Sequence, residues 1–140
     1  MKTTLTALAL TAFAALPALA AGDAEAGKKV FNQCQTCHVV AAPDGTVLAG
    51  KGSKTGPNLY NVIGRAAGTY PEFKYGESIV ALGAGGFAWT EADIATYVQD
   101  PAAFLKDKLG DSKAKSKMMF KLKKEEDAAN VAAFLASLSQ

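Results

Sequence analysis

The chain has 140 residues, 49% of them hydrophobic, with 15 basic and 13 acidic residues and a net charge of +2 at pH 7. This near balance gives no electrostatic argument for a nucleic acid partner. Two cysteines and one histidine are too few for a zinc site with four Cys or His ligands. The length suits one domain around one hydrophobic core, and no internal repeat is visible.

Residues 1–21 have the pattern of a secretory signal peptide. Lys2 stands near the start, an apolar run follows, and Ala18-Leu19-Ala20 forms a small-residue cleavage site. The apolar run is shorter than the roughly 20 residues needed to span a bilayer. We therefore expect cleavage after about Ala20 or Ala21, which would export residues 22–140 to the periplasm as a single domain.

The first helix of the exported chain is predicted to start after Asp23, which can cap it, and to run toward Cys34. Gly27 and Phe31 lie on one face at i, i+4 spacing. A glycine inside a helix costs up to about 1 kcal/mol relative to alanine, so Gly27 indicates close approach by another backbone. The expected partner is the last helix, from about Glu125 to Leu138.

Cys34-Gln35-Thr36-Cys37-His38 is the attachment motif for c-type haem. On a helical turn, positions i, i+3 and i+4 share a face, so Cys34, Cys37 and His38 would point the same way. Each sulfur can form a thioether with a haem vinyl group, and the imidazole can bind iron. His38 is the chain's one histidine, so it has no competitor as proximal ligand.

A redox-active dithiol is the alternative interpretation of the two cysteines. It would require a thioredoxin-like βαβ context, and the sequence shows no strand-rich pattern. An exported protein could also join two cysteines in a disulfide. Thioether bonds to haem would use both thiols, and haem attachment is the interpretation we prefer.

The segment after the motif is predicted to be mostly loop. Residues 39–55 are rich in turn formers such as Pro43-Asp44-Gly45. The apolar segment Leu59–Ile63 could form one or two helical turns, and a short helix is expected from Gly76 to Leu82.

Two further helices are predicted between Thr90 and Gly110. Thr90 can cap the first helix, Asp100-Pro101 ends it and starts the second, and Gly110 is expected to stop the second. Together with the first and last helices this makes four or five helices and no convincing strand. The predicted fold class is all-α.

Removal of the signal would leave Met118 and Met119 as the chain's methionines. Thioether sulfur is a haem-iron ligand that raises the reduction potential, although methionine also fills gaps in cores. Spacing alone does not choose between the two residues.

Eight lysines lie between positions 106 and 124, offset only by Asp107 and Asp111. A charge run is often no more than a solvated surface. The alternative is a positive surface beside the haem edge that steers the protein to acidic partners. The eight are Lys106, Lys108, Lys113, Lys115, Lys117, Lys121, Lys123 and Lys124.

An ordered set of residues resembles class I cytochromes c, and within them the longer bacterial type called cytochrome c2. The resemblance covers nearly all of residues 22–140 and implies an all-α fold with four to five helices around one covalently bound haem c. Besides the haem motif, its landmarks are Gly27, Phe31, Lys54-Thr55-Gly56-Pro57-Asn58-Leu59, Gly64-Arg65, Phe73-Lys74-Tyr75, Trp89, Tyr97, Asp100-Pro101 and Ser116-Lys117-Met118-Met119-Phe120.

The resemblance also implies roles for single residues. The Pro57 carbonyl would accept a hydrogen bond from the second nitrogen of His38. Met118 would be the second axial ligand of the iron, with Phe120 near the exposed haem edge. Arg65, Tyr75 and Trp89 match residues that hold a haem propionate. Tyr97 matches a tyrosine that is hydrogen-bonded near the methionine ligand. The three aromatic residues could also be plain core residues.

The implied function is electron transfer without catalysis, because iron with two protein ligands has no open position for a substrate. The resemblance implies a monomeric carrier that takes electrons from the cytochrome bc1 complex. It would pass them, in short-lived complexes, to a photosynthetic reaction centre, a terminal oxidase or another reductase with an acidic docking site. A haem enzyme or gas sensor with a labile sixth ligand is the alternative.

Overall fold

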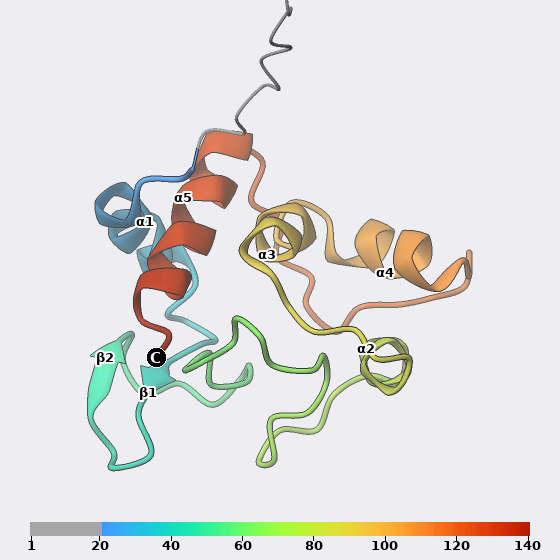
Figure 1. The fold of residues 1–140 in the computed structure, drawn as a ribbon, viewed down its shortest axis with the longest axis horizontal. Coiled ribbons are helices and arrows are strands. Elements are labelled where there is room, and N and C mark those ends of the chain that lie inside the picture. The colour runs from blue at the N-terminus through green and yellow to red at the C-terminus, as the bar shows by residue number, and fades with distance from the viewer. Residues whose placement is uncertain (1–20) are drawn as a thin grey trace, which may run out of the picture.

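The computed structural model describes residues 21–140, which form a mainly helical domain (Figure 1). The predicted signal peptide, apart from its last residue, lies outside this described part. No helix among the described residues is both long enough and apolar enough to span a membrane. The elements in the described part are α1 (Ala24–Val30), a 3-10 helix η1 (Phe31–Gln33), β1 (Val40–Ala41), β2 (Val47–Ala49), α2 (Glu77–Ala84), α3 (Glu91–Tyr97), α4 (Pro101–Leu109) and α5 (Glu125–Ser137).

Helices α1 and α5, from the two ends of the described chain, pack against each other (Figure 1). A Cβ atom added to Gly27 would lie 1.9 Å from the carbonyl oxygen of Asn130, so no side chain fits at this crossing. Phe31 packs on Phe134 with the ring centroids 5.6 Å apart. The close approach predicted at Gly27 and its partner helix are confirmed.

The predicted helix ends hold for most elements. The Asp23 carboxylate accepts hydrogen bonds from the backbone of Glu25 and Ala26 at the start of α1. The predicted helix toward Cys34 is present, with α1 tightening into the 3-10 helix η1 at Phe31. In α3, Thr90 Oγ1 accepts a hydrogen bond from the Asp93 amide at 3.1 Å.

Helix α4 also begins and ends where the sequence indicated. Asp100 accepts a hydrogen bond from the Ala103 amide at 3.0 Å, with Pro101 as the first helical residue. Gly110 ends α4 in the left-handed conformation, with φ of 62°. The segment predicted as a short helix from Gly76 forms α2, which extends to Ala84.

Two local predictions were wrong. The loop after the haem motif contains an antiparallel hairpin, β1 paired with β2, whose turn at residues 42–46 is closed by a 2.9 Å bond from the Ala42 amide to Thr46. Strands of two and three residues are too short to show an alternating pattern. Leu59–Ile63 forms turns and not helix, because Asn61 adopts the left-handed conformation with φ of 50°.

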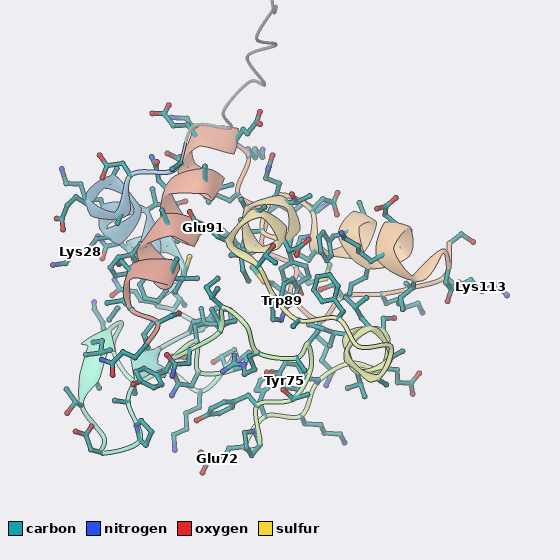
Figure 2. The ribbon with its side chains drawn as sticks, viewed as in Figure 1. Lys28, Glu72, Tyr75, Trp89, Glu91 and Lys113 are labelled. Atoms are coloured by element: carbon teal, nitrogen blue, oxygen red, sulfur yellow. The ribbon has the colours of Figure 1, made fainter. Side chains whose placement is uncertain are left out.

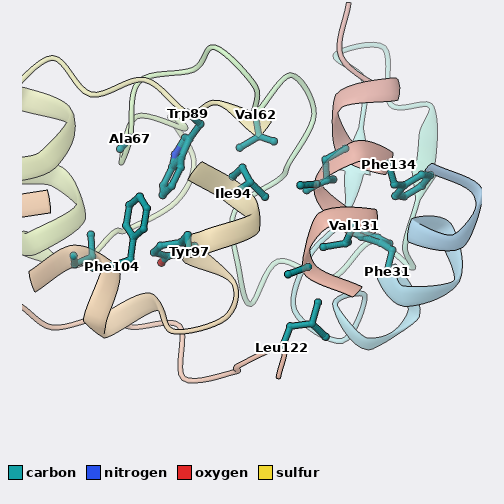
Figure 3. Close-up of a cluster of buried hydrophobic side chains, with 14 of the residues drawn as sticks. Phe31, Val62, Ala67, Trp89, Ile94, Tyr97, Phe104, Leu122, Val131 and Phe134 are labelled. Carbon is teal, nitrogen blue, oxygen red and sulfur yellow. The ribbon is translucent and has the colours of Figure 1, made fainter. Parts of the chain in front are cut away.

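The buried side chains form one hydrophobic core with two parts (Figure 3). One is aromatic: the Trp89 ring stacks on Phe104 at 5.7 Å, and Tyr97 meets Trp89 edge-on at 4.9 Å. The other lies between α1 and α5 and includes Phe31 and Val131. The space between these groups is the candidate site.

Candidate functional site

A cavity of about 1000 Å³ opens between the aromatic group, the α1–α5 pair and the chain before α5. This volume lies at the upper end of the range for small-molecule and cofactor sites, roughly 300–1000 Å³. Every residue predicted to hold the cofactor or its iron lines this one cavity: Cys34, Cys37, His38, Pro57, Arg65, Tyr75, Trp89, Tyr97, Met118 and Phe120.

The Cys-x-x-Cys-His segment is a helical turn. The amide of Cys37 donates to the carbonyl of Cys34 at 3.0 Å, and the amide of His38 donates to the same oxygen at 2.9 Å. All three side chains line the cavity, as the spacing predicted. Burial, helped by the neighbouring Cys37, raises the pKa of the Cys34 thiol to about 11. Redox dithiols depend on a lowered thiol pKa, so the structure disfavours that alternative.

His38 is held by a hydrogen bond and by close packing. Its Nδ1 lies 2.9 Å from the carbonyl oxygen of Pro57, where Nδ1–H donates and Nε2 is left as the metal-binding nitrogen. Burial lowers the pKa of His38 and outweighs the opposing effect of the Pro57 hydrogen bond, so the ring stays in the neutral form that binds metals.

Gly56 packs directly against the imidazole. A Cβ at this position would lie 2.5 Å from His38 Cε1 and 2.7 Å from Nδ1. The amide of Gly56 also donates to the Cys37 carbonyl at 2.7 Å. The sequence reasoning gave Gly56 no role, although it stood beside Pro57 in the quoted landmark.

Arg65 and Trp89 bring hydrogen-bond donors to the cavity. Arg65 donates to the carbonyls of Asn58 and Tyr60 at 3.0 and 3.1 Å, which occupies two of its five N–H groups. Trp89, at the centre of the molecule in Figure 2, is only 6% exposed, and its indole N–H donates to no residue in the described chain. Because Trp89 lines the cavity, its indole N–H can bond to a group held there.

The two tyrosines have partners within the protein. The Tyr75 hydroxyl accepts a 3.4 Å hydrogen bond from the Tyr70 amide. The Tyr97 hydroxyl lies 3.4 Å from Ser116 Oγ, which also accepts the amide of Met118 at 3.1 Å. Tyr97 is therefore linked to the backbone of Met118 through Ser116, a residue quoted in the landmark but not assigned a role.

Met118 and Met119 differ in burial. Met118 is partly buried and packs against the hydrophobic core, whereas Met119 is 82% exposed. Phe120 is 39% exposed at the cavity rim. Across residues 21–140, no group of three or more His, Cys, Asp or Glu side chains could hold a metal ion. His38, Met118 and Met119 all line the cavity.

All eight lysines of the basic run are exposed, but they are not equivalent. Lys115 and Lys117 line the cavity, as does Lys74, which the sequence reasoning had not included. Lys108 pairs with Asp93 at 3.3 Å and Lys121 with Asp100 at 2.7 Å. Lys113 lies at the outer tip of the molecule (Figure 2).

Comparison with known proteins decides the family. The Cytochrome c family model matches residues 24–139. The chain belongs to the cytochrome c family. It is 62% identical over 138 residues to a cytochrome c2 from Rhodobacter capsulatus, with 99% of this chain and 98% of that protein covered. It is 59% identical over 133 residues to a cytochrome c2 from Cereibacter sphaeroides, with 94% and 92% covered.

Solved structures agree with this assignment. The structure of cytochrome c2 isolated from Rhodobacter capsulatus matches with a TM-score of 0.78 and 69% identity, over 83% of this chain and 97% of that one. The resemblance to class I cytochromes c of the c2 type and the all-α fold class are thereby confirmed. Members of the family carry covalently bound haem c, so the chain is a haem protein of electron transport.

The residues at the cavity fit that cofactor. Two sulfurs and an imidazole stand together on one turn, and a partly buried thioether lines the same cavity. The Trp89 indole and the remaining N–H groups of Arg65 can bind carboxylates at its edge.

Proposed function

We propose that this cytochrome is a periplasmic one-electron carrier whose iron is bound by His38 and Met118. The observation that carries the proposal is the convergence of the haem motif and the methionine pair on one cavity, where Met118 is partly buried against the core and Met119 is 82% exposed. Because the protein would fill both axial positions, no site would remain for a substrate. This is why we propose a carrier and not an enzyme.

The chain's own residues would hold the cofactor from several sides. Cys34 and Cys37 would supply the thioether sulfurs and His38 Nε2 the proximal ligand, with Pro57 fixing the ring through Nδ1. When bound, haem c supplies a reversible Fe(II)/Fe(III) couple. The aromatic and aliphatic walls would exclude water from it. Arg65 would neutralise the propionates, and Tyr75 and Trp89 would help to orient them.

Lysines beside the cavity would guide partners to the exposed haem edge. Lys115 and Lys117 line the cavity next to Phe120, and all three side chains are exposed. We propose that they steer a monomer to acidic docking sites. The donor would be the cytochrome bc1 complex, and the acceptor a photosynthetic reaction centre or a terminal oxidase or reductase. Such electrostatic attraction raises association rates by roughly 10- to 1000-fold at low salt.

The axial ligands are tested by visible and near-infrared spectra of the protein made in cells able to attach haem. Wild type and Met119→Leu should show a methionine-to-iron charge-transfer band, and Met118→Ala should lose it. A band that is lost in the Met119 variant and kept in Met118→Ala would reverse the assignment. A ferrous wild type that binds carbon monoxide readily at neutral pH would favour the gas-sensor alternative.

Steering is tested by the dependence of electron-transfer rates on ionic strength. Lys115→Glu should slow reduction by the cytochrome bc1 complex at low salt and flatten its salt dependence. Lys28→Glu makes the same charge change on α1, away from the cavity (Figure 2), and should have little effect. Equal slowing in both variants would mean that net charge, and not the cavity rim, controls association.

Export and processing also belong to the proposal. We propose that residues 1–21 direct the chain to the periplasm and are removed after about Ala20 or Ala21. The mass and N-terminal sequence of the protein from a periplasmic extract test this directly, and recovery of the full-length chain from the cytoplasm would contradict it.

A further inference from the structure

Met118 lies in a segment that has no regular secondary structure of its own. Residues 114–122, called the strap here, contain no helix or strand. Buried residues fix both ends, since Ala114 is 3% and Leu122 4% exposed. Between these ends, Met118 is positioned by its own packing against the core and by hydrogen bonds from the strap to other elements.

One set of these bonds joins the strap to α3 and the residues that follow it. The Leu122 amide donates to the Val98 carbonyl at 2.8 Å, and Ser116 Oγ lies 3.4 Å from the Tyr97 hydroxyl. Lys121, also in the strap, pairs with Asp100 just before α4 at 2.7 Å.

The second set joins the strap to α2 and the residues just before it. The amide of Lys115 donates to Ser78 Oγ at 3.0 Å, across 37 residues of sequence. The Lys117 ammonium donates to the Lys74 carbonyl at 2.9 Å. The lysine bond depends on a long, exposed side chain, whereas Ser78 is a short side chain fixed in the first turn of α2. Ser78 is thus the more rigid link between α2 and the strap.

We infer that Ser78 is a positioning residue for the Met118 sulfur and acts through the backbone of Lys115. The inference rests on the proposed role of Met118 as axial ligand. Without the Ser78 hydroxyl, water can satisfy the exposed Lys115 amide, so the fold loses little. The strap, however, loses one of its two hydrogen bonds to α2 and the residues just before it, and states with Met118 detached become more populated.

The expected size follows from one hydrogen bond. A typical intramolecular hydrogen bond shifts an equilibrium by roughly three- to tenfold. Ser78→Ala should raise the detached fraction of Met118 by about this factor. Alanine has a higher helix propensity than serine, so α2 is expected to persist in the variant.

Competition with added imidazole measures that fraction. The ferric holoprotein is titrated with imidazole while the methionine-to-iron band is followed. Ser78→Ala should lose the band at a roughly three- to tenfold lower imidazole concentration than wild type. Ser78→Thr keeps a hydroxyl and should titrate like wild type. As a control, Ser137→Ala removes another serine hydrogen bond, to the Phe134 carbonyl at 2.6 Å within α5 and away from the cavity lining, and should also titrate like wild type.

Amide hydrogen exchange tests the contact without reference to the ligand. The Lys115 amide should be protected in wild type and exchange faster in Ser78→Ala, but not in Ser137→Ala. Rapid exchange in wild type would overturn the inference, as would equal imidazole titrations of wild type and Ser78→Ala. A wild-type band that survives Met118→Ala would instead overturn the ligand assignment, and the inference with it.

Discussion

Gly56 gives the sharpest test of how the protein holds His38. In Gly56→Ala, the new Cβ would lie 2.5 Å from His38 Cε1, so the ring or the backbone must move by about 0.9 Å to reach ordinary contact at 3.4 Å. If the backbone of residues 56 and 57 moves away by that amount, the 2.9 Å bond from Nδ1 to the Pro57 carbonyl lengthens beyond hydrogen-bonding range. If the ring moves, Nε2 leaves its position in the cavity.

Either response has a measurable cost. A partly buried N–H left without an acceptor costs about 1–3 kcal/mol. With a urea m-value of about 1–3 kcal/mol per M, the unfolding midpoint of the holoprotein should fall by roughly 1 M. The proton on His38 Nδ1, followed by NMR in the ferrous protein, should exchange faster because its acceptor has moved.

Gly76→Ala is the matched control. Gly76 lines the same cavity, has an ordinary φ of −75°, and would place its Cβ no closer than 3.4 Å to any neighbour. It should therefore keep the wild-type free energy of unfolding to within about 0.5 kcal/mol. The exchange rate of the His38 ring proton should also stay unchanged. If Gly56→Ala behaves like Gly76→Ala in both measurements, close packing on the imidazole does not position it.

Three other changes have defined outcomes. Gly27→Ala would put a Cβ 1.9 Å from a carbonyl oxygen of α5, so the free energy of unfolding measured in urea should fall by about 1–3 kcal/mol. Lys28→Ala on the same helix should change the free energy of unfolding little. Trp89→Phe keeps an aromatic ring but loses the indole donor, so stability should fall by about 1–3 kcal/mol while the methionine-to-iron band remains. The hydrogen bond with Lys121, followed by that with the Ala103 amide, lowers the pKa of Asp100. The ionised carboxylate therefore stabilises the fold above its ordinary pKa near 3.8, and this stabilisation is lost as the pH falls through the lower pKa of the folded state. Asp100→Asn keeps the helix cap, and its stability deficit relative to wild type should therefore be full at neutral pH and shrink below about pH 4 in urea unfolding curves.

Local signals in the sequence predicted the features that depend on neighbouring residues. Helix starts at Thr90 and Asp100 were predictable because a side-chain cap and the amide it binds lie three residues apart. The shared face of the haem motif follows from the same short-range geometry. Gly27 was informative for a different reason: an unfavourable residue inside a helix indicates a contact that needs it.

Features set by distant contacts were not predictable in this way. The hairpin β1–β2 is too short to leave a pattern, and Asn61 turns the chain where apolar residues suggested helix. The charge run gave no hint that Lys108 and Lys121 pair with carboxylates whereas Lys115 lines the cavity. Which lysines border the site depends on where α3 and α4 place their acidic residues.

The two proposed iron ligands are supported by different kinds of structure, and this difference predicts which one is released first. His38 sits on a hydrogen-bonded turn, with Pro57 bonded to one ring nitrogen and Gly56 packed against the ring. Met118 sits in the strap, which has no helix or strand and is held mainly by hydrogen bonds to distant segments, such as that from the Lys115 amide to Ser78. Since the turn is closed by its own backbone bonds whereas the strap depends on contacts far away in the sequence, mild denaturant should abolish the methionine-to-iron band before it releases the histidine. Loss of both ligands in a single transition would show that the strap and the turn unfold as one cooperative unit.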